Sequence, residues 1–202
     1  MYKNFINTNF VVIFDIMLYN DFLKGKNIYS IKTKNGEKVN FRAPRKSDLD
    51  SITSYINNLV EEEAMILVNK KVSKENERTY LNRMIKRNKN KEDIFLCAEC
   101  QGKIIGIASI GKGRYREKHV GSLGIGVSMK YRHSGIGRAF IKLLLDMSKN
   151  LKLNLITLEV FKKNLNAIGL YKKMGFKKVG EIPQKIYYKG KYENVLIMYR
   201  EL

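Results

Sequence analysis

The sequence predicts an α/β fold with a mixed β-sheet, and two kinds of pattern support this fold class. Alternating apolar residues surround Asn35-Gly36, which is the strongest short signal for a β-hairpin. Apolar strands at 120–129 and 155–161 flank a segment with the apolar repeat of a helix, so these two strands should pair in parallel. Since hairpins pair antiparallel, the sheet should contain both kinds of pairing.

The first hairpin should cover 28–43, and a helix is predicted over 47–60. Ser47 is the expected N-cap of that helix, with Asp50 in the capping-box position. The face that this helix buries should carry the apolar residues that share one side of it: Leu49, Ile52, Ile56 and Leu59.

A second helix is expected over 73–88, followed by two strands, 93–99 and 103–110, that join at Gln101-Gly102. The helical repeat directs one set of its side chains toward the sheet: Tyr80, Leu81, Met84 and Ile85. A polar, basic loop then leads into the strand 120–129.

The second half of the chain should hold a helix that ends near Asn150, the strand 155–161, and a short helix over 164–174 that Gly175 ends. Two closing strands are expected at 176–182 and 195–201. The buried stripe of the longer helix follows the helical repeat: Ile136, Phe140, Leu143, Leu144 and Met147.

The domain organisation is predicted to be simple. The chain shows no internal repeat, low-complexity tract or Pro/Gly linker, so 28–202 should form one domain. Residues 1–27 are interpreted as an N-terminal extension that packs on this domain or on a partner. The apolar stretch within it is too short to span a membrane and contains Asp15, and no signal-peptide cleavage site follows.

The charge of the chain is strongly positive, with 39 Lys and Arg against 19 Asp and Glu, a net charge of +20 and a pI near 9.9. Such a surface attracts anions, among them nucleic acids, phosphorylated small molecules, acidic proteins and membrane headgroups. The positive residues are spread along the chain, so a general bias toward Lys, Asn and Ile is an equal explanation.

The two cysteines, Cys97 and Cys100, form a CxxC spacing that does not favour a metal site here. They lie on a predicted strand, where residues three apart point to opposite faces. No second Cys or Cys/His pair would complete a zinc site. We therefore expect reduced thiols, no metal, and a cytoplasmic protein.

The segment YRHSGIGRAF, residues 131–140, combines glycines and basic residues at the start of a predicted helix. Both features disfavour a helix start, where the macrodipole is positive and glycine costs helix propensity. A bound phosphate would reverse both effects, because free N–H groups, Arg132 and Arg138 would all face an anion. The motif therefore predicts a phosphate-binding loop.

Two familiar nucleotide-binding patterns do not fit this loop. A P-loop would require Lys-Ser/Thr after Gly137, where Arg138 stands. A dinucleotide fingerprint would require a third glycine at Phe140, although Glu159 stands near the distance of its ribose-binding acid. The glycine loop also comes late in the chain for a dinucleotide-binding fold.

Gly124 and Gly126 lie inside the strand that precedes the loop. Glycine weakens a strand unless it bulges or another chain approaches closely. A strand opened in this way can accept an extended ligand as a neighbour through backbone hydrogen bonds. An amide-bearing pantetheine arm along the strand, with phosphates at the helix start, describes coenzyme A.

With these two features the sequence resembles the GNAT N-acetyltransferase superfamily. VSMKYRHSGIGRAF is similar to the acetyl-CoA signature of that family, and LEVFKKNLNAIGLYKKMGF is similar to its second signature. The spacing agrees in both segments, and the order of elements fits from Ile28 to the C-terminus. The resemblance implies one domain with a mostly antiparallel central sheet, flanking helices and a splayed parallel strand pair at the acetyl-CoA site.

The resemblance also implies roles for particular residues. Asn164 would hydrogen-bond the CoA arm, Tyr171 would protonate the departing thiolate, and Glu159 takes the place of the general base in some members. Backbone groups on the opened strand would hold the acetyl carbonyl and pantetheine: Ile125, Gly126 and Val127. The loop and helix start would wrap the pyrophosphate: Arg132, His133, Ser134, Gly135, Ile136, Gly137 and Arg138.

The chemistry of these residue types supports the roles unevenly. A phenol can donate a proton to a thiolate, and Tyr171 lies two helical turns after Asn164, so both can address one ligand. The alternative role for Tyr171 is a core aromatic that packs beside Leu170, and the acid role is favoured over it. Glu159 is either the base or an exposed or salt-bridged residue, and a water chain is the other candidate. Many relatives place an acid where this chain has Ser122.

We therefore expect an acetyl-CoA-dependent N-acetyltransferase in which a primary amine attacks directly within a ternary complex. The acceptor stays open between a protein N-terminus, an amino acid, a polyamine and a drug. Its pocket should be built from the first two predicted helices and the closing hairpin around 183–195. Two other readings are a basic nucleic-acid-binding module, supported by the aromatic-basic run at 185–192, and a domain that binds acetyl-CoA without catalysis. A homodimer is also left open.

Overall fold

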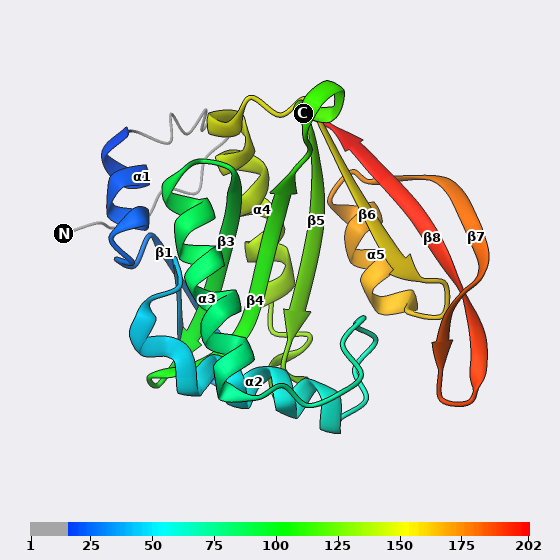
Figure 1. Ribbon diagram of the computed structural model, residues 1–202, viewed down its shortest axis with the longest axis horizontal. Helices are drawn as coiled ribbons and strands as arrows, with labels where there is room; N and C mark the ends of the chain where they lie inside the picture. Colours follow the sequence, from blue (N-terminus) through cyan, green and yellow to red (C-terminus); the bar gives the residue numbers. More distant parts are fainter. Residues whose placement is uncertain (1–15) are drawn as a thin grey trace.

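An eight-stranded sheet with the order β1-β2-β3-β4-β5-β6-β8-β7 organises the computed structural model, which describes residues 16–202 (Figure 1). Neighbouring strands pair antiparallel except β5 and β6, which are parallel, so the predicted mixed and mostly antiparallel sheet is confirmed. The strands are β1 Tyr29–Lys32, β2 Lys38–Arg42, β3 Asp93–Cys100, β4 Lys103–Lys112, β5 Val120–Val127, β6 Leu155–Phe161, β7 Lys177–Tyr188 and β8 Lys191–Glu201.

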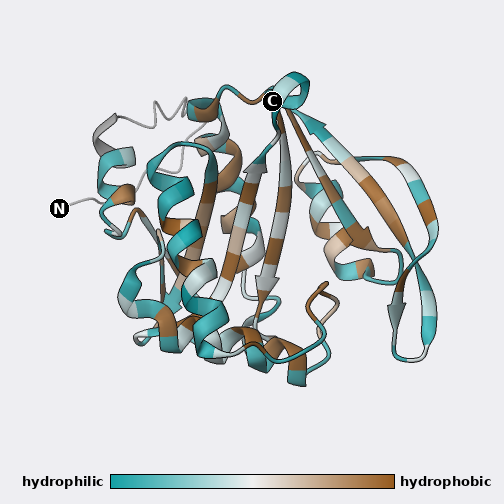
Figure 2. Cartoon of the chain, viewed as in Figure 1, coloured by the Kyte–Doolittle hydropathy of each residue, from teal (hydrophilic) through white to brown (hydrophobic). Residues whose placement is uncertain are grey.

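Helices cover both faces of the sheet (Figure 1). Residues of α2 and α3 pack with β3 and β4 in a smaller core cluster, whereas α1, α4 and α5 contribute to a larger cluster on the opposite face. Figure 2 shows apolar residues concentrated on the central strands and polar residues along much of α3. The helices are α1 Ile16–Leu23, α2 Leu49–Glu61, α3 Lys74–Lys89, α4 Ile136–Ser148 and α5 Leu165–Lys173.

Both predicted hairpins of the first half form. At the β3–β4 turn, Gln101 and Gly102 adopt φ angles of 49° and 77°, as expected for a tight hairpin turn. The β1–β2 turn is longer than a two-residue loop: Thr33 N–H donates to Glu37 O, and Gly36 alone of the Asn35-Gly36 pair has a positive φ, 79°. The closing strands β7 and β8 extend well beyond the predicted 176–182 and 195–201.

The N-terminus of α2 differs from the prediction that Ser47 caps it. A short 3-10 turn, Lys46–Asp48, precedes the helix, and no side chain among the described residues caps α2 at Asp48. The Asp48 carboxylate instead accepts the Arg45 backbone N–H at 2.6 Å and is bonded to Arg42. The turn therefore holds the Asp48 carboxylate against the Arg42 guanidinium, and this carboxylate does not cap α2.

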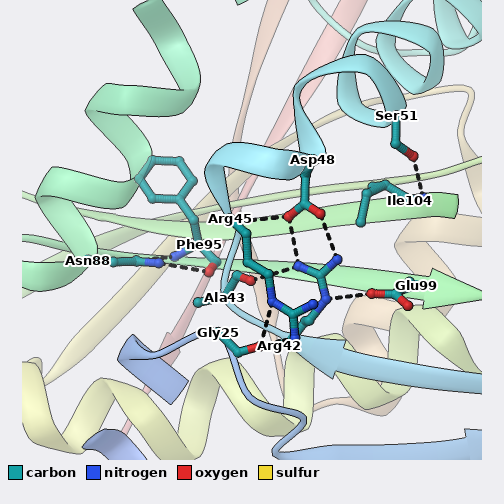
Figure 3. A network of polar contacts seen from close by, with 10 residues as sticks. All are labelled: Gly25, Arg42, Ala43, Arg45, Asp48, Ser51, Asn88, Phe95, Glu99 and Ile104. Carbon is teal, nitrogen blue, oxygen red and sulfur yellow. Dashed lines mark hydrogen bonds and ion pairs between the residues drawn. The ribbon is translucent and has the colours of Figure 1, made fainter. Parts of the chain in front are cut away.

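Arg42 forms a buried polar network with two carboxylates (Figure 3). Its Nη1 and Nη2 each lie 2.7 Å from an Asp48 oxygen, and its Nε lies 2.5 Å from Glu99 Oε2. Nη1 also donates to Ala43 O at 3.0 Å. Burial lowers the pKa of Arg42, but the hydrogen bonds and charges of Asp48 and Glu99 outweigh this effect and raise it. The network fixes β2, β3 and the start of α2 relative to one another.

The inward face of α3 is rotated from the predicted one. Leu81 and Met84 are buried as expected, but Tyr80 is 39% exposed and lies edge-on to Phe95. Asn88 takes the core-facing place, because its side chain bonds both the N–H and the C=O of Phe95 at 2.7 and 3.1 Å. A polar residue can lie on the buried face when both of its amide groups are satisfied.

The described part of the N-terminal extension packs on the sheet domain. Tyr19 and Phe22 of α1 are buried in the larger core cluster, and the Arg45 guanidinium donates to Gly25 O. The expectation for residues 1–15 lies outside the described residues. Across 16–202, no helix has the length and apolar character that crossing a bilayer requires.

Cys97 and Cys100 are both free and buried. Cys97 belongs to the smaller cluster beneath α2 and α3, and Cys100 to the larger cluster on the other face. The prediction that they point to opposite faces is confirmed. Among the residues that the structure describes, no three His, Cys, Asp or Glu side chains gather into a metal-binding group.

Candidate functional site

The parallel strands β5 and β6 separate along their length (Figure 1). They are in register only where Val120 to Ser122 face Leu155 to Thr157, although β5 continues to Val127. On its other side, β5 pairs with β4 along nearly its whole length. Within the described chain, the edge of β5 that faces β6 therefore has no strand partner after Ser122.

A cavity of about 400 Å³ lies at this separation. It is lined by β5, by the loop before α4, by α5, and by the segment that follows α2. The structure brings together most of the site residues expected from the sequence: Ile125, Gly126, Val127, Arg132, His133, Gly135, Gly137, Arg138, Asn164 and Tyr171. The expected residues Ser134, Ile136 and Glu159 do not line it.

The start of α4 has the features of an anion site. Gly135 is its N-cap with φ +90°, a left-handed conformation that glycine adopts without steric cost. No side chain within residues 16–202 caps this helix start, and its first turn holds no acidic residue. The Ile136 side chain is buried and Ser134 Oγ donates to Tyr131 O, so these two residues offer the cavity only backbone groups.

Arg132 lines the cavity but already has partners. Its Nε donates to Val127 O at 2.9 Å, and its Nη2 pairs with Glu62. Glu62 Oε2 also accepts the Met129 N–H at 3.1 Å. Glu62, at the C-terminal end of α2, therefore holds the loop that leads to α4. The sequence gives no local signal for this contact, because the two residues lie 70 positions apart.

Gly126 lets a tyrosine from α2 approach β5 closely. A Cβ at this position would lie 2.5 Å from the hydroxyl oxygen of Tyr55, which is only 3% exposed. Burial raises the pKa of Tyr55, and a hydrogen bond with the backbone of Ile107 opposes this effect. The predicted close approach at Gly126 is therefore made in part by the chain itself. The spacing of Tyr55 between Ile52 and Leu59 would have placed it on the buried face.

Tyr171 and Asn164 lie on and before α5 and both line the cavity. Tyr171 is 8% exposed and packs edge-on to Phe176 at 5.8 Å between ring centres. Burial raises the pKa of Tyr171 to about 12, so its phenol stays protonated at neutral pH. Asn164 Oδ1 accepts the Ala167 N–H at 3.2 Å and thereby caps the helix.

Glu159 lies on the opposite side of the sheet from Tyr171. Along β6, Leu158 and Val160 are buried in the larger cluster, and alternation turns Glu159 to the other face, where it is exposed. Its two carboxylate oxygens each lie 2.5 Å from Lys185 Nζ on β7. The salt-bridged state considered from the sequence is thus the one observed.

The hairpin of β7 and β8 reaches the segment that follows α2. Tyr188 Oη donates to Glu63 O at 2.6 Å, and Lys189 pairs with the Glu63 carboxylate. Tyr187 and Tyr192 form an exposed pair with ring centres 5.3 Å apart. The aromatic-basic run at 185–192 therefore encloses the β7–β8 turn beside the end of α2.

A second cavity of about 710 Å³ lies between α4, the end of α5 and the strands β7 and β8. Arg138 lines both cavities. The basic side chains around the second cavity are Arg138, Lys142, Lys173, Lys177 and Arg200. Their charge suits an anionic ligand, and Glu201 is the acidic residue in its lining.

Fold and cavity together define an α/β protein that opens a parallel strand pair beside a helix start that no described side chain caps. The profile of the Acetyltransferase (GNAT) domain matches residues 41–197. The chain therefore belongs to the GNAT acetyltransferase family.

Similar proteins include the L-amino acid N-acetyltransferase AaaT of Escherichia coli strain K12, 32% identical over 52% of this chain and 66% of that protein. The match covers less than half of the other curated relatives, between 40% and 48%.

The crystal structure of a ribosomal-protein-alanine N-acetyltransferase from Brucella melitensis superposes with a TM-score of 0.72 and 26% identity, over 80% of this chain and 99% of that one. A phosphinothricin acetyltransferase from Sinorhizobium meliloti, solved in complex with acetyl-CoA, shares the fold at a TM-score of 0.72 and 20% identity. That similarity covers 81% of this chain and 88% of the other.

Proposed function

We propose that the protein transfers the acetyl group of acetyl-CoA to a primary amine by direct attack in a ternary complex. One observation carries the proposal: the unpaired edge of β5, the uncapped start of α4 and the protonated phenol of Tyr171 border the same cavity. Membership of the GNAT family and a structural neighbour solved with acetyl-CoA support it further.

In this proposal the residues around the cavity hold acetyl-CoA at both ends. The backbone N–H groups at the start of α4, near Gly135 and Gly137, would bind the pyrophosphate. The pantetheine arm would add to the open edge of β5, as an extended ligand adds to a sheet. Since Asn164 Oδ1 serves the helix, its Nδ2 group would meet the arm. CoA carries one further phosphate outside its pyrophosphate. Arg138, which lines both cavities, would direct this phosphate toward the second, basic cavity.

Two groups would act on the thioester. Backbone N–H groups of β5 near Ile125 and Val127 would stabilise the oxyanion that forms when the amine attacks. As the C–S bond breaks, Tyr171 would give its proton to the thiolate of CoA. Its raised pKa keeps that proton in place at neutral pH. Neither step requires a group outside the cavity.

The acceptor amine must lose a proton before it attacks, and Glu159 is the carboxylate proposed to take it, directly or through water. Glu159 lies at the start of the strand separation and on the face opposite α5. In that arrangement acetyl-CoA enters beside α4 and α5, and the amine approaches from the other face. Lys185 has to release the carboxylate for this to happen.

Amine-dependent release of CoA thiol, followed colorimetrically, tests the proposal. The acceptor pools are amino acids, peptide N-termini, polyamines and aminoglycosides, and the first two come first because relatives are named for such acceptors. Release that depends on one pool would establish the activity and the acceptor class. A folded protein that binds acetyl-CoA but releases thiol with no pool would favour binding without catalysis.

A further inference from the structure

The contact between Lys185 and Glu159 depends on an irregularity in β7. Ile182 faces Val195 and Ile186 faces Glu193, so three residues of β7 oppose Asn194 alone. Gln184 adopts φ +52° within this bulge, and its N–H donates to Asn194 Oδ1 at 3.0 Å. Bulges re-aim side chains. Here the bulge brings Lys185 Nζ to 2.5 Å from both oxygens of Glu159.

Other lysines near this hairpin pair with carboxylates away from β6. Lys178 and Lys162 both pair with Glu181 on β7, and Lys189 pairs with Glu63 after α2. Lys185 instead reaches the β6 carboxylate that stands where β5 and β6 begin to separate. The bulge thus delivers one primary amine to the carboxylate that is proposed as the base of the reaction.

Glu159, the partner of Lys185, lies where the strands β5 and β6 begin to separate. Thr157 is the last β6 residue in register with β5, opposite Ser122, and Glu159 is the next residue on the same face. Tyr171 lies on the opposite face, in the larger core cluster. A thioester held between the strands would have the phenol on one side and the Lys185 amine on the other.

We propose that Lys185 occupies the acceptor-amine site and is acetylated on Nζ when no acceptor is bound, an inference that rests on the proposed function. Glu159 takes a proton from the Lys185 ammonium, and the free amine attacks the thioester carbon. The C–S bond breaks, the new C–N bond forms, and the thiolate takes its proton from Tyr171. The second proton leaves the attacking nitrogen and restores the Tyr171 phenol through solvent. The products are Nε-acetyl-lysine, CoA thiol and one proton, so no further reactant is needed.

Acetylation would end this contact. An acetylated lysine carries no charge and one amide hydrogen, so it can no longer hold both oxygens of a carboxylate as an ammonium does. An external acceptor has to displace the same ammonium from Glu159. Acceptor and Lys185 therefore compete for one site, and acceptor at saturating concentration should suppress the modification.

Mass spectrometry of the full chain incubated with acetyl-CoA and no acceptor tests the inference. We expect one acetyl group to appear at Lys185 at least about tenfold faster than at Lys191, an exposed lysine that begins β8 and serves as the matched control. The rate per chain should not change with protein concentration. Lys185→Arg should abolish this fast acetylation and Lys191→Arg should leave it intact. Tyr171→Phe should slow it at Lys185 without affecting Lys191.

The outcomes separate this inference from the proposed function. If the protein acetylates an external amine while Lys185 gains acetyl no faster than Lys191, the inference is wrong and the function stands. A rate that rises with protein concentration also overturns it, because the transfer would then occur between molecules. If neither thiol release nor acetylation of Lys185 is detected, both proposals fall together.

Discussion

The molecule contains one ion-pair cluster in its interior and one ion pair near its surface. Arg42 bonds Asp48 and Glu99 in the interior, where the three side chains are 3%, 9% and 20% exposed (Figure 3). Lys185 bonds Glu159 near the surface, with side chains 35% and 45% exposed. Both contacts are short and satisfy the carboxylate. They differ in what surrounds them.

The difference in burial gives the two ion pairs different roles: the buried one is structural, and the exposed one can be exchanged for another contact. Removing one member of a buried ion pair leaves the other charge uncompensated and away from water. When one member of a surface pair is removed, water readily solvates the charge that remains. Arg42 also presents a planar fork that satisfies several acceptors at once, while the Lys185 ammonium is a single mobile point. The buried network therefore fixes the strands, and the exposed pair can open for another amine.

The largest expected effect is on stability, from the variant Arg42→Met. It should lower the free energy of unfolding by about 3–5 kcal/mol, because the buried Asp48 carboxylate and the partly buried Glu99 carboxylate would both lose their cationic partner. Lys185→Met is the matched control and should cost no more than about 1 kcal/mol. Urea unfolding monitored by circular dichroism compares them. Equal losses for the two variants would contradict the distinction drawn between the pairs.

The next effect is on catalysis and concerns the buried phenol of Tyr171. Tyr171→Phe should lower kcat roughly 10²-fold or more, the usual scale for loss of a general acid. Stability should change little, because the ring still packs on Phe176. Amine-dependent thiol release at saturating acetyl-CoA measures kcat. Full activity in the phenylalanine variant would remove Tyr171 from the mechanism and leave it as a core aromatic.

A smaller effect is expected where α2 touches β5. Gly126→Ala should destabilise the fold by about 1–3 kcal/mol, because its new Cβ would meet the Tyr55 hydroxyl at 2.5 Å. Combining it with Tyr55→Phe should cost less than the sum of the two single changes. A double-mutant cycle in urea provides the comparison. Additive losses would mean that the hydroxyl is not what Gly126 accommodates.

The smallest effect concerns pH. Burial raises the pKa of Tyr171 to about 12, so the phenol keeps its proton and kcat should show no alkaline fall from this group below about pH 10. The direction follows from the charge: burial disfavours the phenolate, which would appear only above the raised pKa. A pH–rate profile between pH 6 and 10 tests this. An alkaline limb near pH 8 that Tyr171→Phe abolishes would contradict the assigned protonation state.

From residue 28 onward, local patterns in the sequence were sufficient for the succession of strands and helices along the chain and for most residues of the cavity, whereas the helix α1 was not predicted. Glycines inside a strand or at a helix start indicate a close approach of the backbone to another group. Gly126 and Gly135 could therefore be predicted to line the cavity from their neighbouring residues alone. The stripe of α4 was also correct, because its periodicity is strong.

Contacts between distant residues could not be predicted. Arg42 meets Glu99 over 57 positions, Arg132 meets Glu62 over 70, and Lys185 meets Glu159 over 26. The prediction that Ser47 caps α2 was wrong for the same reason. The Asp48 carboxylate bonds the distant Arg42 side chain and does not cap its own helix. The bulge that aims Lys185 depends on the pairing of β7 with β8, which no short segment specifies.

A crystal structure of the protein with CoA bound would test the central claim most directly. We expect the pyrophosphate within about 3.5 Å of backbone N–H groups at the start of α4, and the thiol beside the Tyr171 hydroxyl. The pantetheine amides should pair with the open edge of β5. A CoA molecule held in the basic cavity alone, with its thiol away from Tyr171 and the β5 edge empty, would contradict the account.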